Sequence, residues 1–120
     1  MSETQESTGR VHSLVMPQIV CLCGSTRFAD AWITAHREES LAGRIVLSVG
    51  VMIHAGDAPI REDGPEKRAL DELHLRKIDL ADEVLVLNVG GYIGESTRKE
   101  LKYSRSVGKP VRFLEPDTSA

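Results

Sequence analysis

The chain is poor in cysteine and in aromatic residues, and it contains no long apolar run. Its two cysteines, Cys21 and Cys23, lack the Cys-x-x-Cys spacing of redox and zinc motifs. Apart from histidine, its aromatic residues are one Trp, two Tyr and two Phe. Of these, Tyr92 alone lies in a segment where we expect a ligand, which disfavours a flavin site. No segment approaches the roughly 20 consecutive apolar residues of a membrane-spanning helix.

An excess of positive charge is also missing. There are 15 Lys and Arg residues against 18 Asp and Glu residues, a net charge of −3. No basic field therefore spans the chain to attract a nucleic-acid polymer. The first ten residues, MSETQESTGR, lack the basic and apolar regions of a secretory signal. We expect a cytoplasmic protein that binds neither nucleic-acid polymers nor membranes, although a small anionic ligand needs only a local positive site.

What the chain does have is the composition of one globular domain. Of its 120 residues, 41% are hydrophobic and 28% are charged, which is ordinary for a single folded unit. Residues 1–15 are polar and show no periodicity, which predicts a flexible tail. We expect residues 16–120 to form a single α/β domain.

Apolar runs alternate with segments of helical periodicity in this domain. The expected strands cover 18–23, 44–49, 83–88 and 111–114. The expected helices cover 26–40, 66–81 and 97–107, and a loop rich in glycine covers 50–65. Strands separated by helices pair in parallel through right-handed crossovers. We therefore predict a flavodoxin-like α/β fold, with an open parallel sheet of four to five strands flanked by helices. Ligands bind such sheets at the carboxyl ends of the strands.

The cysteines and histidines do not suggest a metal site. Cys21 and Cys23 fall two residues apart on an expected strand, so their side chains share one face. We interpret both as small buried apolar side chains. The four histidines are scattered, and no carboxylate cluster has ligand spacing.

The first strand ends in a turn suited to an anion. Gly24 lets the backbone approach a ligand, and Ser25 and Thr26 supply hydroxyl groups at a helix start, where unpaired amides favour negative charge. Arg27 adds a fixed positive charge. We predict that all four residues contact a ligand. The alternative is that Ser25 or Thr26 only caps the helix.

A second polar turn opens the last helix. Thr97 and Glu100 have the spacing of a Thr-x-x-Glu capping box, which needs no function. At the same spacing, both side chains lie on one helix face near the strand ends, where a carboxylate can act on a ligand. The residues alone leave both interpretations open. Ser96 belongs to the same turn, and Asn88 ends the strand before it, so we expect both to contact the ligand.

Two histidines are further candidates. His74 lies beside apolar positions of the second helix, which fits either a structural role or an acid or base, because imidazole titrates near neutral pH. His54 lies in the long loop, a natural lid or base-recognition element. Asp79 and Asp82 precede the third strand, so we expect them at the opposite end of the sheet, with structural roles.

In order, these features resemble a known family. The chain has a strand ending in CGSTR and a helix with His74 about eight residues before an Ala-Asp pair. An apolar strand follows, then a turn with Glu100 three residues after Thr97, and finally Gly-Lys-Pro-Val. Over about residues 18–115, this pattern resembles the nucleoside 2-deoxyribosyltransferase-like superfamily. That superfamily includes deoxyribosyltransferases and nucleoside 5′-monophosphate N-glycosidases.

The resemblance implies chemistry at the anomeric carbon of a nucleoside or nucleotide. It gives Glu100 the role of nucleophile. It also puts His74 where the family often has an aspartate, as the acid for the departing base. It further implies that the sugar or phosphate contacts five residues of the two turns: Gly24, Ser25, Arg27, Ser96 and Thr97.

We therefore expect an N-glycosidase or N-deoxyribosyltransferase that acts on a nucleoside or its 5′-monophosphate and uses no cofactor. The alternative is a non-catalytic sensor or binding domain for a nucleotide-derived ligand, because fold does not fix function. As in the family, we also expect a homo-oligomer, with Trp32 and Tyr103 as candidate interface residues.

Overall fold

The computed structural model describes residues 15–52 and 60–116. Its strands are β2 (Ile19–Cys23), β3 (Ile45–Leu47), β4 (Glu83–Val86) and β5 (Val111–Phe113). Its helices are α1 (Ala29–Leu41), α2 (Pro65–Leu80) and α3 (Glu95–Ser106), with a short 3-10 turn, η3 (Val89–Gly91). Within the described ranges, no helix has the length and apolarity needed to cross a membrane.

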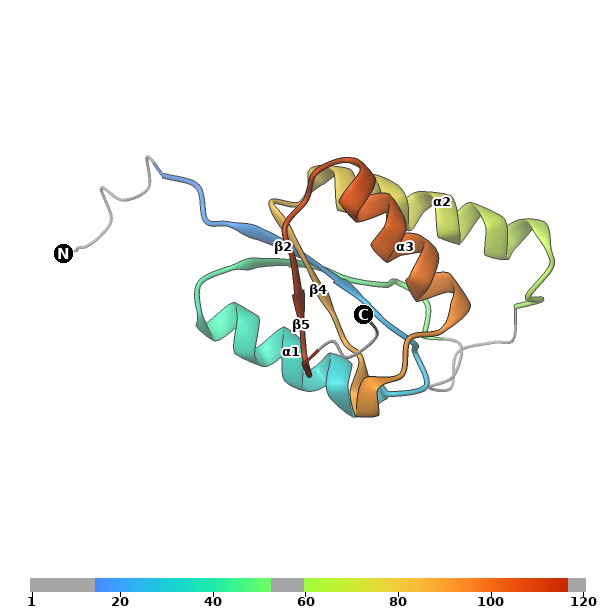
Figure 1. Ribbon diagram of the computed structural model, residues 1–120, viewed down its shortest axis with the longest axis horizontal. Coiled ribbons are helices and arrows are strands. Elements are labelled where there is room, and N and C mark those ends of the chain that lie inside the picture. Colours follow the sequence, from blue (N-terminus) through green and yellow to red (C-terminus); the bar gives the residue numbers. More distant parts are fainter. Residues whose placement is uncertain (1–14, 53–59, 117–120) are drawn as a thin grey trace, which may run out of the picture.

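The four strands form one open, all-parallel sheet in the order β3-β2-β4-β5 (Figure 1). Cys21 of β2 is paired with Leu47 on one side and Val84 on the other. This confirms the predicted flavodoxin-like α/β fold. The chain adds β3 on one side of β2 and β4 on the other, so the strand order reverses at β2. In parallel sheets, the crevice beside such a reversal is where ligands bind.

Helices cover both faces of the sheet, and side chains that alternate along β2 pack against the helices of each face. Val20 and Leu22 point to the face covered by α1, where Trp32 and Ala35 are buried. Cys21 and Cys23 point to the opposite face, in a cluster with residues of α2, α3 and β4. Since strand side chains alternate between faces, the prediction that the two cysteines share a face is confirmed.

Two predicted helix starts differ from the structure. Helix α1 begins at Ala29 instead of Thr26, because Ser25 to Phe28 form a turn closed by a 3.2 Å bond from Phe28 N to Ser25 O. Helix α3 begins at Glu95, with Gly94 as its N-cap residue and no side-chain capping bond. The capping-box interpretation is therefore wrong: Thr97 and Glu100 lie inside the helix.

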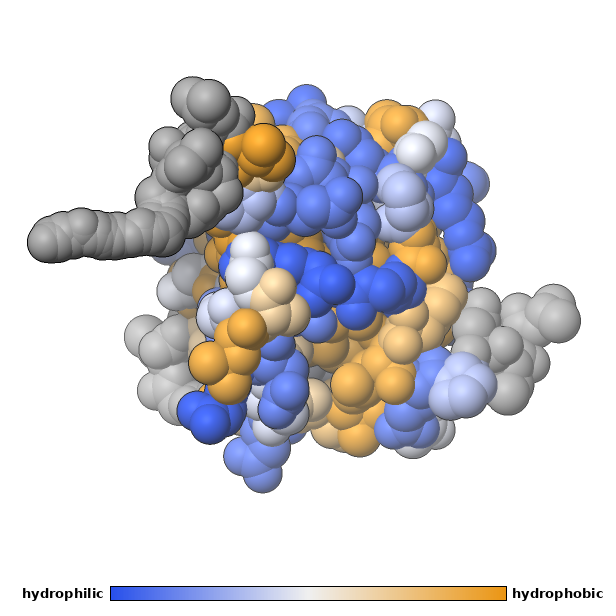
Figure 2. Space-filling model, turned by 90° about the vertical axis from the view of Figure 1, so that its left-hand side faces the viewer, coloured by the Kyte–Doolittle hydropathy of each residue, from blue (hydrophilic) through white to orange (hydrophobic). Residues whose placement is uncertain are grey.

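Apolar side chains are also exposed on the surface. Ile33, Leu41 and Leu80 are each about two-thirds exposed, at 67%, 70% and 69%. Figure 2 views the side of the molecule where β2 begins, and apolar side chains gather there in the lower half among hydrophilic ones. Trp32, in contrast, is only 2% exposed. Its proposed place in a subunit interface is thus corrected, because its ring is already covered by its own chain.

Candidate active site

A cavity of about 410 Å³ lies at the carboxyl end of β2, between the turn that follows this strand and helices α2 and α3. Its volume is in the usual range for small-ligand pockets. Eight residues that the sequence predicted as site residues line it: Gly24, Ser25, Thr26, Arg27, His74, Ser96, Thr97 and Glu100. They come from three segments that are far apart in the chain. The fold therefore brings most of the predicted site together.

Gly24 is favoured by packing as well as by its place at the cavity. A Cβ atom added to Gly24 would lie 3.0 Å from the Leu87 Cβ atom and 3.2 Å from the Leu87 carbonyl oxygen. A larger residue would therefore require the end of β4 to move by a few tenths of an ångström. This close approach sets the position of the turn that follows.

The turn after Gly24 holds Arg27 at the cavity. The Ser25 hydroxyl accepts hydrogen bonds from Arg27 Nε at 3.1 Å and from Arg27 N at 3.3 Å. The Ser25 carbonyl accepts one at 3.0 Å from Nε1 of the buried Trp32. The Arg27 guanidinium lies 4.9 Å from the ring centroid of Tyr92, which also lines the cavity. The turn is thus attached to the core, and its cation faces the ligand space.

Lys67 is a cavity residue that the sequence analysis missed. Its ammonium group donates to Ser96 Oγ at 3.2 Å and to Asp71 Oδ1 at 2.7 Å, which links α2 to α3. Lys67 occurs near the start of α2, in a segment with several other charged residues, so no local signal distinguished it. Arg27 and Lys67 lie beside the hydroxyl groups of Ser25 and Ser96, and Lys77 is a third cation on the cavity wall.

Glu100 is a carboxylate on the cavity wall, from the second turn of α3. Burial raises its pKa to about 6, although the charge of His74 and a hydrogen bond with the Cys23 thiol act in the opposite direction. A carboxyl group with such a pKa is largely ionised at neutral pH and is poorly solvated. Shifted titrating groups in clefts are characteristic of functional sites.

His74 is 4% exposed and also lines the cavity. Its Nε2 atom lies 3.0 Å from the Leu22 carbonyl oxygen, which fixes the ring against the end of β2. Burial lowers the pKa of His74, but a hydrogen bond with Cys21 and the negative charge of Glu100 outweigh it and leave the pKa raised. His74 and Glu100 therefore influence each other electrostatically at one wall of the cavity.

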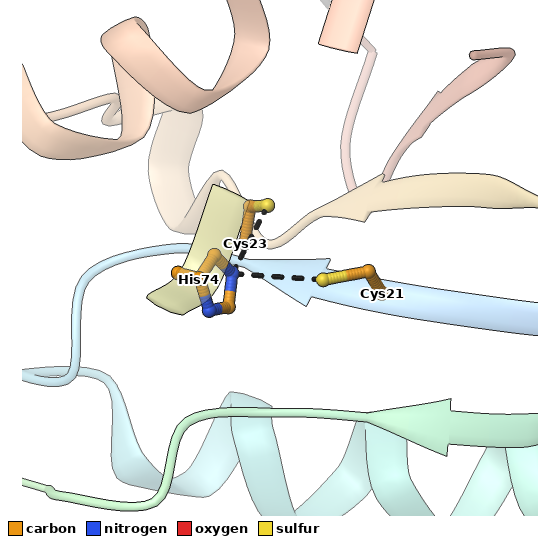
Figure 3. Close-up of side chains that lie close together, drawn as sticks. All are labelled: Cys21, Cys23 and His74. Carbon is orange, nitrogen blue, oxygen red and sulfur yellow. Dashed lines mark hydrogen bonds between the residues drawn. The ribbon is translucent and has the colours of Figure 1, made fainter. Parts of the chain in front are cut away.

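Two cysteines lie directly behind this wall, where the sequence analysis expected only inert core. Cys21 Sγ lies 3.6 Å and Cys23 Sγ 3.5 Å from His74 Nε2 (Figure 3). A hydrogen bond with Cys23 lowers the pKa of Cys21 to about 6, against the effect of burial, while the pKa of Cys23 is raised. No local sequence pattern indicated this contact, because only the packing of α2 on β2 brings His74 to the thiols.

Two other predicted ligand residues are not placed at the cavity. Asn88 does not line it, and its side chain is fully used elsewhere: Oδ1 accepts from Glu115 N at 2.9 Å and Nδ2 donates to Glu115 O at 3.0 Å. Its assignment as a ligand contact is thus corrected to that of a support for the segment after β5. His54 lies outside the described residues. Asp82 accepts a 2.8 Å bond from Ile19 N at the start of β2, as its predicted structural role requires.

Comparisons with protein families, with characterised proteins and with solved structures found no match. The arguments for function therefore come from the chemistry of the cavity. That chemistry comprises the partly buried carboxylate of Glu100, the buried imidazole of His74, three cations and several hydroxyl groups, together with further acidic side chains, around one space at the carboxyl edge of a parallel sheet.

Proposed function

We propose that this protein cleaves the N-glycosidic bond of a nucleoside or nucleoside 5′-monophosphate, as an N-glycosidase or N-deoxyribosyltransferase, with Glu100 as nucleophile. The observation that carries the proposal is that Glu100 and His74 line the same cavity of about 410 Å³. The resemblance to nucleoside 2-deoxyribosyltransferase-like proteins, stated from the sequence, points to the same two residues.

The proposed step is a displacement at the anomeric carbon. A carboxylate oxygen of Glu100 forms a bond to this carbon while the bond to the base nitrogen breaks, and the electron pair leaves with the base. Positive charge that develops on the sugar ring is stabilised by the carboxylate. Water, or a second base, then displaces Glu100 and restores the free carboxylate. With a pKa of about 6, Glu100 is mostly in the ionised form that this step needs at pH 7.

The departing base needs a proton, and His74 is the proposed donor. It is buried, lines the cavity and has a raised pKa. A raised pKa increases the fraction of imidazolium near neutral pH, which is the form that can protonate a leaving group. In this proposal Glu100 is the nucleophile that attacks the sugar, and His74 is the acid that protonates the departing base.

The polar groups at the cavity favour a 5′-monophosphate over a neutral nucleoside. Arg27 and Lys67 are cations, and Ser25 and Ser96 offer hydroxyl groups beside them. Phosphate oxygens are commonly bound by such a combination of fixed positive charge and hydrogen-bond donors. The start of α3 adds the partial positive charge of a helix N-terminus.

A second candidate is a non-catalytic sensor of a nucleotide-derived ligand. The anion-binding groups, Arg27, Lys67, Ser25 and Ser96, would serve binding alone equally well. A ligand that binds only the folded protein raises its melting temperature. Stabilisation by nucleotides without release of base would favour this candidate.

The deciding experiment is a screen for base release. Purified protein is incubated with each common nucleoside and 5′-monophosphate, with and without a second free base, and the products are separated by chromatography. We expect release or exchange of a base, loss of at least about 100-fold in rate for Glu100→Gln, and normal rate for Glu72→Gln. Glu72 is a matched control because its side chain is 64% exposed on α2 and paired with Arg76. Full activity of Glu100→Gln contradicts the mechanism.

A further inference from the structure

The cluster behind the cavity wall contains three metal-binding atoms. Cys21 Sγ, Cys23 Sγ and His74 Nε2 all lie within 4.8 Å of one another. Figure 3 shows the imidazole of His74 at the carboxyl end of β2, with Nε2 turned toward both thiols. Both cysteines are fully buried and His74 nearly so. Thiolates and imidazole are the ligands that bind zinc in proteins.

The separations of His74 Nε2 from the two sulfur atoms match those of tetrahedral zinc coordination. Zinc lies about 2.3 Å from thiolate sulfur and about 2.1 Å from imidazole nitrogen, so a tetrahedral angle separates the two ligand atoms by about 3.6 Å. The observed separations of His74 Nε2 from the two sulfur atoms are 3.6 and 3.5 Å. We infer that Cys21, Cys23 and His74 form a binding site for one thiophilic divalent cation, with Zn²⁺ as the ion of best fit.

The contacts of His74 and Cys21 with the Leu22 carbonyl show which hydrogen bonds a bound cation would replace. His74 Nε2 lies 3.0 Å from the Leu22 carbonyl oxygen, and Cys21 Sγ lies 3.8 Å from the same oxygen. When the cation binds, both thiols end as thiolates and the imidazole as neutral, with its proton on Nδ1. The protons released pass to solvent, and two metal–sulfur bonds and one metal–nitrogen bond replace the hydrogen bonds. Metal affinity in proteins generally includes such proton release.

The three side chains leave a fourth coordination position for water. His74 lines the cavity, so we expect the cation to enter from there. Three protein ligands and one open position are typical of catalytic zinc sites, whereas structural sites are closed by four protein ligands. The site does not depend on the proposed glycosidase activity. A cation on His74 would instead remove its proton-donating role and inhibit that activity.

Titration with Co²⁺ tests the site directly. The full chain, reduced and freed of metal, is titrated while its absorption spectrum is recorded. We expect one equivalent per chain, visible bands of tetrahedral Co²⁺, and a near-ultraviolet band from thiolate to cobalt. The chain has no cysteines besides Cys21 and Cys23, so this second band can come only from them. Zn²⁺ should then displace Co²⁺ and abolish the bands. A featureless spectrum throughout the titration overturns the inference, and the cluster is then a hydrogen-bonded group only.

Variants assign the ligands. Cys21→Ser and Cys23→Ser should each weaken Zn²⁺ binding by more than about 10-fold, whereas His36→Ala, which changes an exposed histidine of α1, should bind like the wild type. Each variant's melting temperature with Zn²⁺ is compared with its own metal-free value, so loss of stability cannot mimic loss of binding. Wild-type affinity in both cysteine variants overturns the inference. Because absorption needs no substrate, this result is independent of the screen for base release.

Discussion

Lys67 Nζ lies 3.2 Å from Ser96 Oγ and joins the first turns of α2 and α3 at the cavity. Its side chain is only 15% exposed, and it is also paired with Asp71. A largely buried ammonium group next to a hydroxyl group is a strong candidate to bind a substrate phosphate. Under the proposed function, a change at Lys67 should affect a 5′-monophosphate and not a nucleoside, because a nucleoside has no phosphate to bind.

Replacement of Lys67 tests which class the cavity accepts. We expect Lys67→Met to raise KM for a 5′-monophosphate by about 10-fold, the effect of about 1.4 kcal/mol of lost binding, and to leave KM for the nucleoside nearly unchanged. Lys99→Met is the control, because Lys99 is 78% exposed and paired with Glu95. Steady-state kinetics on both substrates measure the difference. Equal losses on the two substrates would argue against phosphate binding by Lys67.

The rate of base release should depend on the ionisation of Glu100. Its pKa is raised to about 6, mainly by burial, and only the ionised carboxylate is nucleophilic. We expect kcat/KM to fall about tenfold per pH unit well below pH 6, to pass through a maximum above it, and to fall again at higher pH as His74, whose pKa is raised, loses its proton. A profile that stays flat down to pH 4.5 would show that Glu100 does not act in this form.

The same burial predicts that Glu100 lowers the stability of the fold at neutral pH. Its folded pKa is about 6 against 4.5 for the ordinary group. The protonated carboxyl group therefore favours the folded state below pH 4.5, and this contribution is lost as pH rises through about 6. We expect Glu100→Gln to gain up to about 2 kcal/mol relative to the wild type between these limits. Urea denaturation at pH 4.5 and pH 7.5 gives both values, and no gain at pH 7.5 would contradict the prediction.

Asn88 should matter for stability and not for catalysis. Its buried side chain makes two hydrogen bonds with the backbone of Glu115. Asn88→Ala leaves those backbone groups without their partner, which we expect to cost about 2 kcal/mol of unfolding free energy. Activity per folded molecule should remain within about twofold of the wild type. Chemical denaturation and kinetics at low temperature separate the two effects, and a large loss of kcat in folded protein would return Asn88 to the site.

Exposed apolar side chains are the reason why we still predict self-association of the chain. Ile33, Leu41 and Leu80 are each about two-thirds exposed, and contact between subunits would remove them from water. We expect the 13.2 kDa chain to elute as a multiple of this mass in size-exclusion chromatography. A clean monomer at micromolar concentration would refute the predicted homo-oligomer.

The layers of the fold and most of the cavity wall follow from local sequence patterns. Alternating apolar runs and helical segments are local patterns, and parallel pairing follows from the lengths of the connections. Since the carboxyl ends of parallel strands share one edge, Ser25, Arg27, Ser96 and Glu100 could be predicted to meet there. Their positions next to strand ends are visible without any knowledge of packing.

The neighbours of those residues, in contrast, depend on how the helices pack on the sheet. The crossing of α2 over β2 puts His74 beside Cys21 and Cys23, about 50 positions away in the chain, and brings Lys67 to Ser96. Helix starts were likewise set by contacts: Gly94, not Thr97, caps α3. Such contacts depend on how helices pack on the sheet, which involves the whole core, whereas strand and helix patterns depend on a few neighbouring residues.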